Sequence, residues 1–105
     1  MSDLPAVVTR YLEAAAPAAL AECFTPDGTV FDEGATYVGR EEIVSWREKT
    51  AGQWTYTTTI TDTAVTGEDR YRVRAHLEGD FPGGVADLAF DFTVDGELIS
   101  SLVIG

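Results

Sequence analysis

"FTVDGELISSLVI", residues 92–104, contains a clear signal for a β-hairpin. Its Asp95-Gly96 dipeptide favours a two-residue hairpin turn, and apolar and polar residues alternate before it. If that dipeptide forms the turn, the predicted cross-strand pairs are Phe92 with Ile99, Phe90 with Ser101, and Leu88 with Val103. One face of the hairpin is then mostly apolar, which is typical of a strand pair that covers a core.

Two further strands precede this hairpin, separated by turns at Phe81–Gly84 and Gly67-Glu68. With those turns as loops, the apolar faces of the strands agree. The residues predicted to face inward include Tyr56, Thr58, Ile60, Asp62, Tyr71, Val73, Ala75, Leu77, Leu88 and Phe90. The residues predicted to face outward include Arg72, Arg74, His76, Asp87 and Asp91, with Arg74 opposite Asp91. The pattern therefore predicts an antiparallel sheet from residue 54 onward.

The first 50 residues have helical spacing of their apolar side chains, interrupted by turn signals. The pattern predicts, in chain order, a helix over residues 4–15, a short helix from Pro17, a turn at Thr25–Gly28, strands over residues 29–32 and 36–38, and a helix over residues 40–50. In the last helix Glu41 lies at the start and Arg47 near the end, as the helix dipole favours. Helices followed mainly by strands indicate an α+β fold.

Length, charge and composition narrow the function classes. A chain of 105 residues fits one domain, residues 1–105. Its net charge of -11 repels phosphates and anionic lipids, so neither nucleic acid nor a membrane is an expected partner. No apolar run approaches the roughly 18 residues of a membrane span, and the N-terminus lacks the basic region of a secretory signal. We therefore expect a cytoplasmic protein.

The single cysteine and the single histidine limit the chemistry further. One cysteine cannot form an internal disulfide, and one histidine leaves no cluster of ligands at zinc spacing. We therefore expect neither a metal nor a cofactor. Cys23 lies in an apolar run between Ala21 and Phe24, so we interpret it as a buried core residue rather than as a nucleophile paired with His76.

Four segments, taken in order, resemble the nuclear transport factor 2-like superfamily, and most closely its SnoaL-like polyketide cyclase and ketosteroid isomerase branch. They are Arg10–Glu13, "FTPDGTVFD" at Phe24–Asp32, "GREEIVSW" at Gly39–Trp46, and Phe92–Ile104. The resemblance covers nearly the whole chain. It implies a cone-shaped half-barrel, in which a curved mixed or antiparallel sheet and three helices enclose an apolar pocket. Because this fold hosts unrelated activities, the resemblance specifies the fold more strongly than the function.

The resemblance also implies site residues. Asp32, at the end of "TVFD", matches the family's general base, and Tyr11 matches the tyrosine that donates a hydrogen bond to the developing enolate oxygen. Trp46 matches an aromatic pocket wall. Leu88 stands where the isomerases have a protonated aspartic acid as the second oxyanion donor. Because loss of one such donor costs roughly 100- to 1000-fold in rate, we do not expect a proficient steroid isomerase.

The residues themselves leave other interpretations open. With 18 acidic residues in the chain, Asp32 could be a solvated turn residue, and Tyr11 lies on an apolar helix stripe where aromatic residues are ordinarily core.

The predicted pocket lining is Trp46, Trp54, Tyr56, Val73, Ala75, Leu77, Leu88, Phe90 and Ser101. Three hypotheses follow: an acid–base isomerase, cyclase or hydrolase acting on a small apolar or carbonyl-bearing molecule, a non-catalytic binder of such a molecule, and a dimerisation module whose cavity is filled by side chains.

Apolar residues also fall on the predicted outer face of the last strand. They are Leu98, Leu102 and Ile104. A patch of that kind on a sheet usually requires a partner. We therefore predict a homodimer that forms through the outer face of the sheet.

Overall fold

The computed structural model describes residues 4–14, 16–53 and 55–105. Trp54, predicted to line the pocket, lies outside the described residues. The elements are α1 (Ala6–Glu13), α2 (Pro17–Ala21), β1 (Phe24–Asp32), β2 (Ala35–Val38), α3 (Arg40–Gln53), β3 (Tyr56–Gly67), β4 (Arg70–Gly79), β5 (Val85–Asp95) and β6 (Leu98–Ile104). The predicted α+β class is confirmed.

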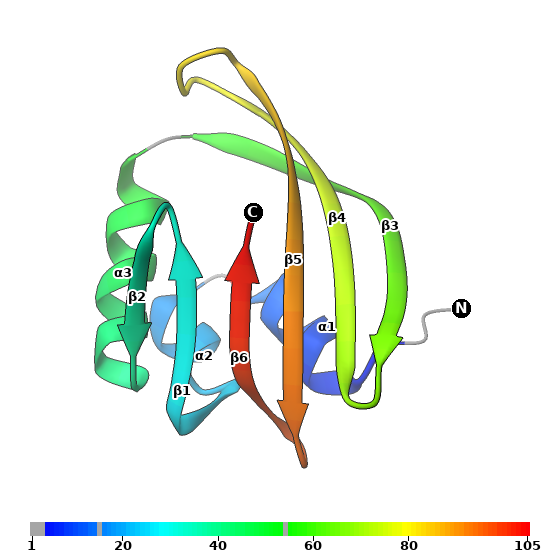
Figure 1. Cartoon of the computed structure of the whole chain (residues 1–105). Helices are drawn as coiled ribbons and strands as arrows, with labels where there is room; N and C mark the ends of the chain where they lie inside the picture. The colour runs from blue at the N-terminus through cyan, green and yellow to red at the C-terminus, as the bar shows by residue number, and fades with distance from the viewer. Residues whose placement is uncertain (1–3, 15, 54) are drawn as a thin grey trace.

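The six strands form one curved, unclosed sheet in the order β2-β1-β6-β5-β4-β3. Neighbouring strands are antiparallel, except that β1 and β6 run parallel, so the sheet is mixed. Figure 1 shows α1 and α2 against one face of the sheet and α3 beside its β2 edge. β3 begins next to α3 and bends across to the opposite edge of the sheet. The helices and the concave face of the sheet thus enclose a common interior.

The core lies between the helices and the centre of the sheet. Its fully buried side chains include Val8 of α1, Phe24 of β1, Ile43 of α3 and Ile99 of β6. The eight residues of α1 are too few for a stable helix in isolation, and packing of its apolar face therefore holds it in place. Within the described residues no helix is long and apolar enough to cross a membrane.

The β5–β6 hairpin has a different register from the predicted one. Its loop is Gly96-Glu97, because Asp95 pairs with Leu98. The register then shifts by one residue, and Ser100 takes the extra position, with its hydroxyl donating to the carbonyl oxygen of Thr93 at 3.2 Å. One inserted residue turns every later side chain to the opposite face of the sheet.

The bulge at Ser100 corrects two predictions. Leu102 pairs with Phe92 and is fully buried, and Ile104 pairs with Phe90 and is 9% exposed. The predicted outward orientation of Leu102 and Ile104 is therefore wrong. Ser101 pairs with Thr93, next to the buried Phe92, so it lies on the outer face instead of lining a pocket.

A second bulge interrupts β3. Ile60 pairs with Ala75 and Asp62 pairs with Arg74, which leaves Thr61 as the extra residue. Asp62 therefore lies on the outer face opposite Arg74, and its predicted inward orientation is wrong.

The β4–β5 register differs from the prediction by two residues, which leaves the faces unchanged. Ala75 pairs with Leu88, and the outward partner of Asp91 is Arg72, not Arg74. Arg72 Nε lies 2.7 Å from Asp91 Oδ1. Because the side-chain period of a strand is two, an even shift changes which residues pair but not which face they occupy.

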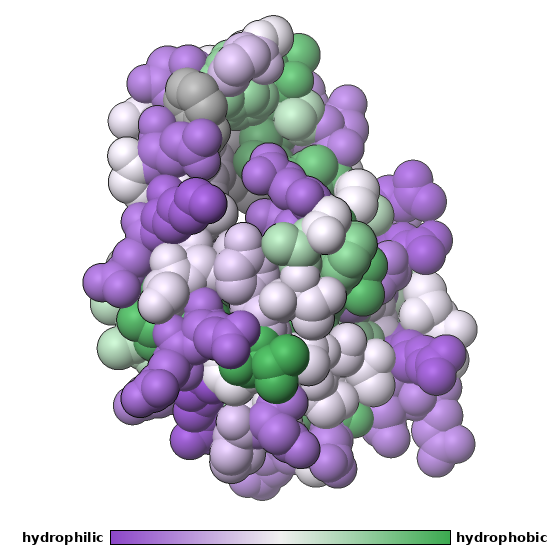
Figure 2. Space-filling model, turned by 60° about the vertical axis from the view of Figure 1, so that its left-hand side comes forward, coloured by the Kyte–Doolittle hydropathy of each residue, from purple (hydrophilic) through white to green (hydrophobic). Residues whose placement is uncertain are grey.

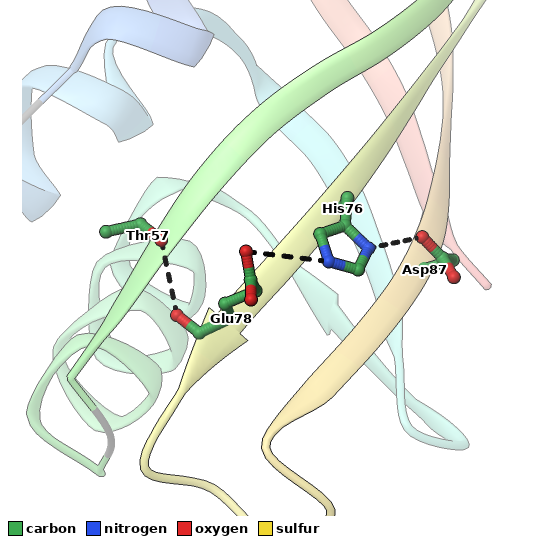
Figure 3. Close-up of polar contacts among 4 residues, drawn as sticks. All are labelled: Thr57, His76, Glu78 and Asp87. Atoms are coloured by element: carbon green, nitrogen blue, oxygen red, sulfur yellow. Dashed lines mark hydrogen bonds and ion pairs between the residues drawn. The ribbon is translucent and has the colours of Figure 1, made fainter.

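The outer face also holds the single histidine (Figure 3). His76 Nδ1 of β4 lies 2.8 Å from Asp87 Oδ1 of β5, and its Nε2 lies 3.8 Å from Glu78 Oε2. The hydrogen bond to Asp87 raises the pKa of His76, partly against the effect of desolvation, and the charges of Asp87 and Glu78 add to the rise. This cluster lies on the face of the sheet opposite the core.

The turn predicted at Thr25–Gly28 is an irregularity within β1. Phe24 pairs with Ile99 and Thr29 with Ser101, so β1 has three more residues than β6 between these pairs. The extra residues, with Pro26 and Gly28 among them, bulge out while the strand continues on both sides. Cys23, just before the strand, is buried, as predicted.

Candidate functional site

A cavity of about 1190 Å³ lies between the helices and the concave face of the sheet. Its apolar wall includes Leu12 of α1, Leu77 of β4, Leu88 and Phe90 of β5, Phe81 and Ile104. Its polar lining includes Tyr11, Asp32, Arg47 and Tyr56. An apolar cavity with a few convergent polar groups is typical of a small-molecule binding site.

The cavity opens to solvent along β3. Every residue of β3 after Tyr56 is exposed, including Thr58, Ile60 and Thr63, which line the cavity. On the side of the molecule that Figure 2 shows, hydrophilic residues cover most of the surface and apolar residues form small, separate groups.

Asp32 is the last residue of β1, because Glu33 and Gly34 then turn the chain with positive φ values of 52° and 81°. Its side chain is partly buried and lines the cavity. The indole Nε1 of Trp46 donates a hydrogen bond to Asp32 Oδ2 at 3.0 Å. Trp46 is itself buried in α3. The indole therefore fixes one carboxylate oxygen of Asp32, and no described residue donates to the other.

Tyr11 extends from the buried face of α1 and is 6% exposed. Its ring makes edge contacts with Phe24 and Phe92, with centroids 5.9 and 5.2 Å apart. Burial raises the pKa of Tyr11 far above its ordinary value; the positive charge of Arg47 opposes this rise, and the charge of Asp32 adds to it. The hydroxyl is therefore protonated at neutral pH, and among the described residues it has no hydrogen-bond partner.

Arg47 and Tyr56 are also part of the polar lining. Arg47 of α3 is partly buried, and its Nη1 donates to the hydroxyl oxygen of Tyr56 at 3.3 Å. Tyr56 was predicted to line the pocket, whereas Arg47 was interpreted only as a helix-dipole residue. Its helical spacing could have revealed it, because Arg47 follows the buried Trp46 and lies four residues after the buried Ile43, on the inner side of α3.

The other predicted lining residues divide into two groups. Leu77, Leu88 and Phe90 line the cavity together with Trp46. Val73 and Ala75 face inward but are buried in the core beneath the cavity, and Ser101 lies on the outer face. Among the described residues no group of three or more His, Cys, Asp or Glu side chains could hold a metal ion.

A curved, unclosed mixed sheet with three helices around a cavity is the nuclear transport factor 2-like fold. Within this class, the chain belongs to the SnoaL-like domain family, whose sequence profile matches residues 1–97. The predicted family and cone-shaped fold are thereby confirmed. No curated protein matches the sequence closely enough to count as a relative.

Solved structures support the same assignment. A candidate polyketide cyclase from Sinorhizobium meliloti is 35% identical, with a TM-score of 0.90 over 98% of this chain and 96% of that chain. A Catenulispora acidiphila protein with a ketosteroid isomerase-like fold, solved with trimethylamine, is 30% identical, with a TM-score of 0.83 over 96% and 85%. A Mycobacterium tuberculosis protein solved with estradiol-17β-hemisuccinate is 15% identical, with a TM-score of 0.74 over 93% and 88%, and shares the fold.

Proposed function

We propose that the cavity binds a small, mainly apolar molecule that carries a carbonyl group, and that Asp32 moves a proton on the carbon next to that carbonyl. In this proposal Tyr11 donates a hydrogen bond to the carbonyl oxygen. The observation that carries the proposal is that Asp32, from the end of β1, and Tyr11, from α1, line the same largely apolar cavity.

The surroundings of Asp32 support its role as a base. Trp46 holds Oδ2, which leaves Oδ1 free of described donors and able to accept a proton from a ligand. A general base must come within about 3 Å of the proton that it removes, and a carboxylate fixed by a buried indole loses little entropy in doing so.

The surroundings of Tyr11 support its role as a donor. When Asp32 removes the proton, the electron pair of the C–H bond moves toward the carbonyl and places negative charge on its oxygen. A protonated, unpaired hydroxyl in a buried position stabilises such a charge more strongly than water does. Return of the proton to another carbon completes an isomerisation, and attack of the carbanion on a second carbonyl completes an aldol-type ring closure.

Exchange of α-protons tests this proposal. With the bicyclic ketone 2-tetralone in D₂O, we expect the wild-type protein to speed the loss of the α C–H signal in proton NMR above the buffer rate. Asp32→Asn should lower the catalysed rate by about 100-fold or more, because general base catalysis contributes at least that much. Tyr11→Phe should lower it by roughly 100-fold.

Full activity of Asp32→Asn would contradict the assignment of Asp32 as the base. Arg74→Gln, on the outer face, is the control and should exchange the ketone at the wild-type rate. An absence of exchange with the wild-type protein would contradict the catalytic proposal.

A binding function without catalysis is the second candidate, and one observation favours it. Leu88 and Phe90 present only hydrocarbon on the stretch of β5 that lines the cavity, so β5 supplies no second acid to stabilise an enolate. In that case Asp32 would act as a hydrogen-bond acceptor for the ligand. A catalyst should both bind the ketone and exchange its α-protons, whereas a pure binding protein should bind the ketone without exchange. Measuring α-proton exchange and ketone binding on the same protein therefore separates the two functions.

A homodimer through the outer face of the sheet is also part of the proposal. Two of the residues that first suggested it, Leu102 and Ile104, face inward, but Phe31 and Val103 pair across β1 and β6 on the outer face and are 41% and 42% exposed. They form an apolar centre for an interface. A cytoplasmic location, predicted from the N-terminal residues, stays a prediction that cell fractionation would test.

A further inference from the structure

Three hydrogen-bond donors line one region of the cavity. Arg47 Nη1 donates to the Tyr56 hydroxyl oxygen at 3.3 Å, so the hydrogen of that hydroxyl is free to point elsewhere. Tyr11 lines the same cavity; burial raises the pKa of its hydroxyl, and the positive charge of Arg47 opposes that rise. Arg47, Tyr56 and Tyr11, which we call the donor cluster, come from α3, β3 and α1 and meet only in the folded chain.

The donor cluster lacks acceptors of its own. Among the described residues, the hydroxyl hydrogens of Tyr11 and Tyr56 have no acceptor, and the guanidinium of Arg47 forms no ion pair. Two other arginines of the chain do have acceptors: Arg40 makes two bonds to the carbonyl oxygen of Phe24, and Arg72 pairs with Asp91. Arg47 thus makes no ion pair among the described residues, although the carboxylates of Glu13, Asp32 and Glu33 also line the cavity.

A buried donor without an acceptor is costly, and a charged one is more so. Tyr11 is 6% exposed and Arg47 is partly buried, and both line the cavity, so a ligand in the cavity can reach their donors. A ligand oxygen with negative charge would satisfy all three residues at once, and guanidinium bonds to such oxygens are about twice as strong as bonds between neutral groups.

We infer that the donor cluster is an anion-binding subsite, and that the cavity takes an amphiphile with an apolar body and one anionic oxygen group such as a carboxylate or a sulfonate. This inference rests on the proposed binding cavity but not on catalysis by Asp32. The apolar body lies against Leu77, Leu88 and Phe90, and the anionic group lies at Arg47. The net charge of -11 disfavours any anion outside the cavity, so the local cation provides the selectivity.

Two dyes of similar shape test the inference. 1-Anilinonaphthalene-8-sulfonate is anionic, and N-phenyl-1-naphthylamine lacks the sulfonate. We measure the Kd of each by fluorescence for the wild-type protein and for Arg47→Gln, Arg47→Lys and Arg74→Gln. We expect Arg47→Gln to weaken binding of the sulfonate at least about tenfold and to change binding of the neutral dye less than twofold. Arg47→Lys should retain part of the preference.

Arg74→Gln is the matched control, because it removes the same charge from the outer face, where Arg74 is opposite Asp62. It should leave both dyes unchanged. Equal loss of both dyes in Arg47→Gln, or no loss of either, would overturn the anion subsite while the binding cavity stands. Failure of both dyes to bind the wild-type protein would overturn the binding cavity itself, and the subsite with it. Circular dichroism of each variant checks that the comparison is made between folded proteins.

Discussion

At the scale of single residues, the site depends on a few contacts that fix polar groups at an apolar wall. The bond from Trp46 to Asp32 holds a carboxylate in one orientation, and the bond from Arg47 to Tyr56 holds a guanidinium. The two donors, Trp46 and Arg47, are consecutive residues of α3, so a single helix makes both contacts.

The histidine on the outer face gives a residue-scale prediction. Its pKa in the folded protein is raised above 6.5, first by the hydrogen bond to Asp87. A raised pKa means that the protonated form of His76 favours folding; this contribution is complete below the unfolded pKa and is lost as pH rises through the folded pKa.

NMR titration of His76, the single histidine of the chain, should therefore give a midpoint above 6.5. Asp87→Asn should lower that midpoint, because it removes the acceptor charge. Asp91→Asn should leave it nearly unchanged, because Asp91 pairs with Arg72. A wild-type midpoint at or below 6.5 would contradict the assignment.

At the scale of elements, bulges decide which side chains reach the cavity. Thr61 in β3 and Ser100 in β6 each add one residue and turn the rest of the strand over. The bulge at Ser100 places Leu102 and Ile104 in the core, which closes the apolar interior beside β1. The bulge at Thr61 places Thr63 rather than Asp62 at the cavity, so the Asp62 carboxylate is not part of its wall.

A glycine at the end of β4 gives an element-scale prediction. A Cβ atom on Gly79 would collide with the Thr55 carbonyl oxygen and with the backbone and Cβ of Tyr56. Gly79→Ala must therefore push the start of β3 away from β4, and we expect it to lower the free energy of unfolding by roughly 1–3 kcal/mol. Urea denaturation measures this change.

Gly52 of α3 is the control for Gly79. A Cβ on Gly52 meets no other atom within 4 Å. Gly52→Ala should raise the free energy of unfolding by about 0.4–1 kcal/mol, because alanine restricts the unfolded chain. Equal effects of the two substitutions would refute the close approach at Gly79.

At the scale of the whole molecule, the cavity exists because the sheet extends further than the helices cover it. The helices pack on β1, β2 and β6, whereas β3 lies at the far edge and is exposed along its length after Tyr56. The curved sheet leaves a hollow on its concave side, and its edge strands β2 and β3 do not pair to close a barrel. A space remains between α1, α3 and β3, and this space is the candidate site.

The homodimer is the prediction that belongs to this scale. Sedimentation equilibrium at micromolar concentration should give twice the chain mass of 11.3 kDa. Val103→Asp should shift the protein toward monomer, because it places a charge at the apolar centre of the proposed interface. Val65→Asp, on the distant edge strand β3, should have no such effect. A wild-type mass of 11.3 kDa would reject the dimer.

The kinds of elements and their order can be predicted from the local sequence. Helical spacing up to α3 and alternation from β3 onward indicate the α+β class, and the motifs that contain Tyr11 and Asp32 indicate the family. These properties are readable because each depends on residues close together in the chain, where the period of apolar side chains reports the local backbone.

The strand registers, the cavity and the donor cluster depend on contacts between segments that are far apart in the chain. Ser100 is a bulge because β6 must pair with β1 and β5 at once, and nothing in "LISSLVI" specifies which residue is the extra one. Arg47 meets Tyr56 because β3 begins next to α3 before it crosses to the far edge of the sheet. Pairing and packing between distant segments fix these features, and a local pattern records only whether a residue is apolar, not which partner it meets.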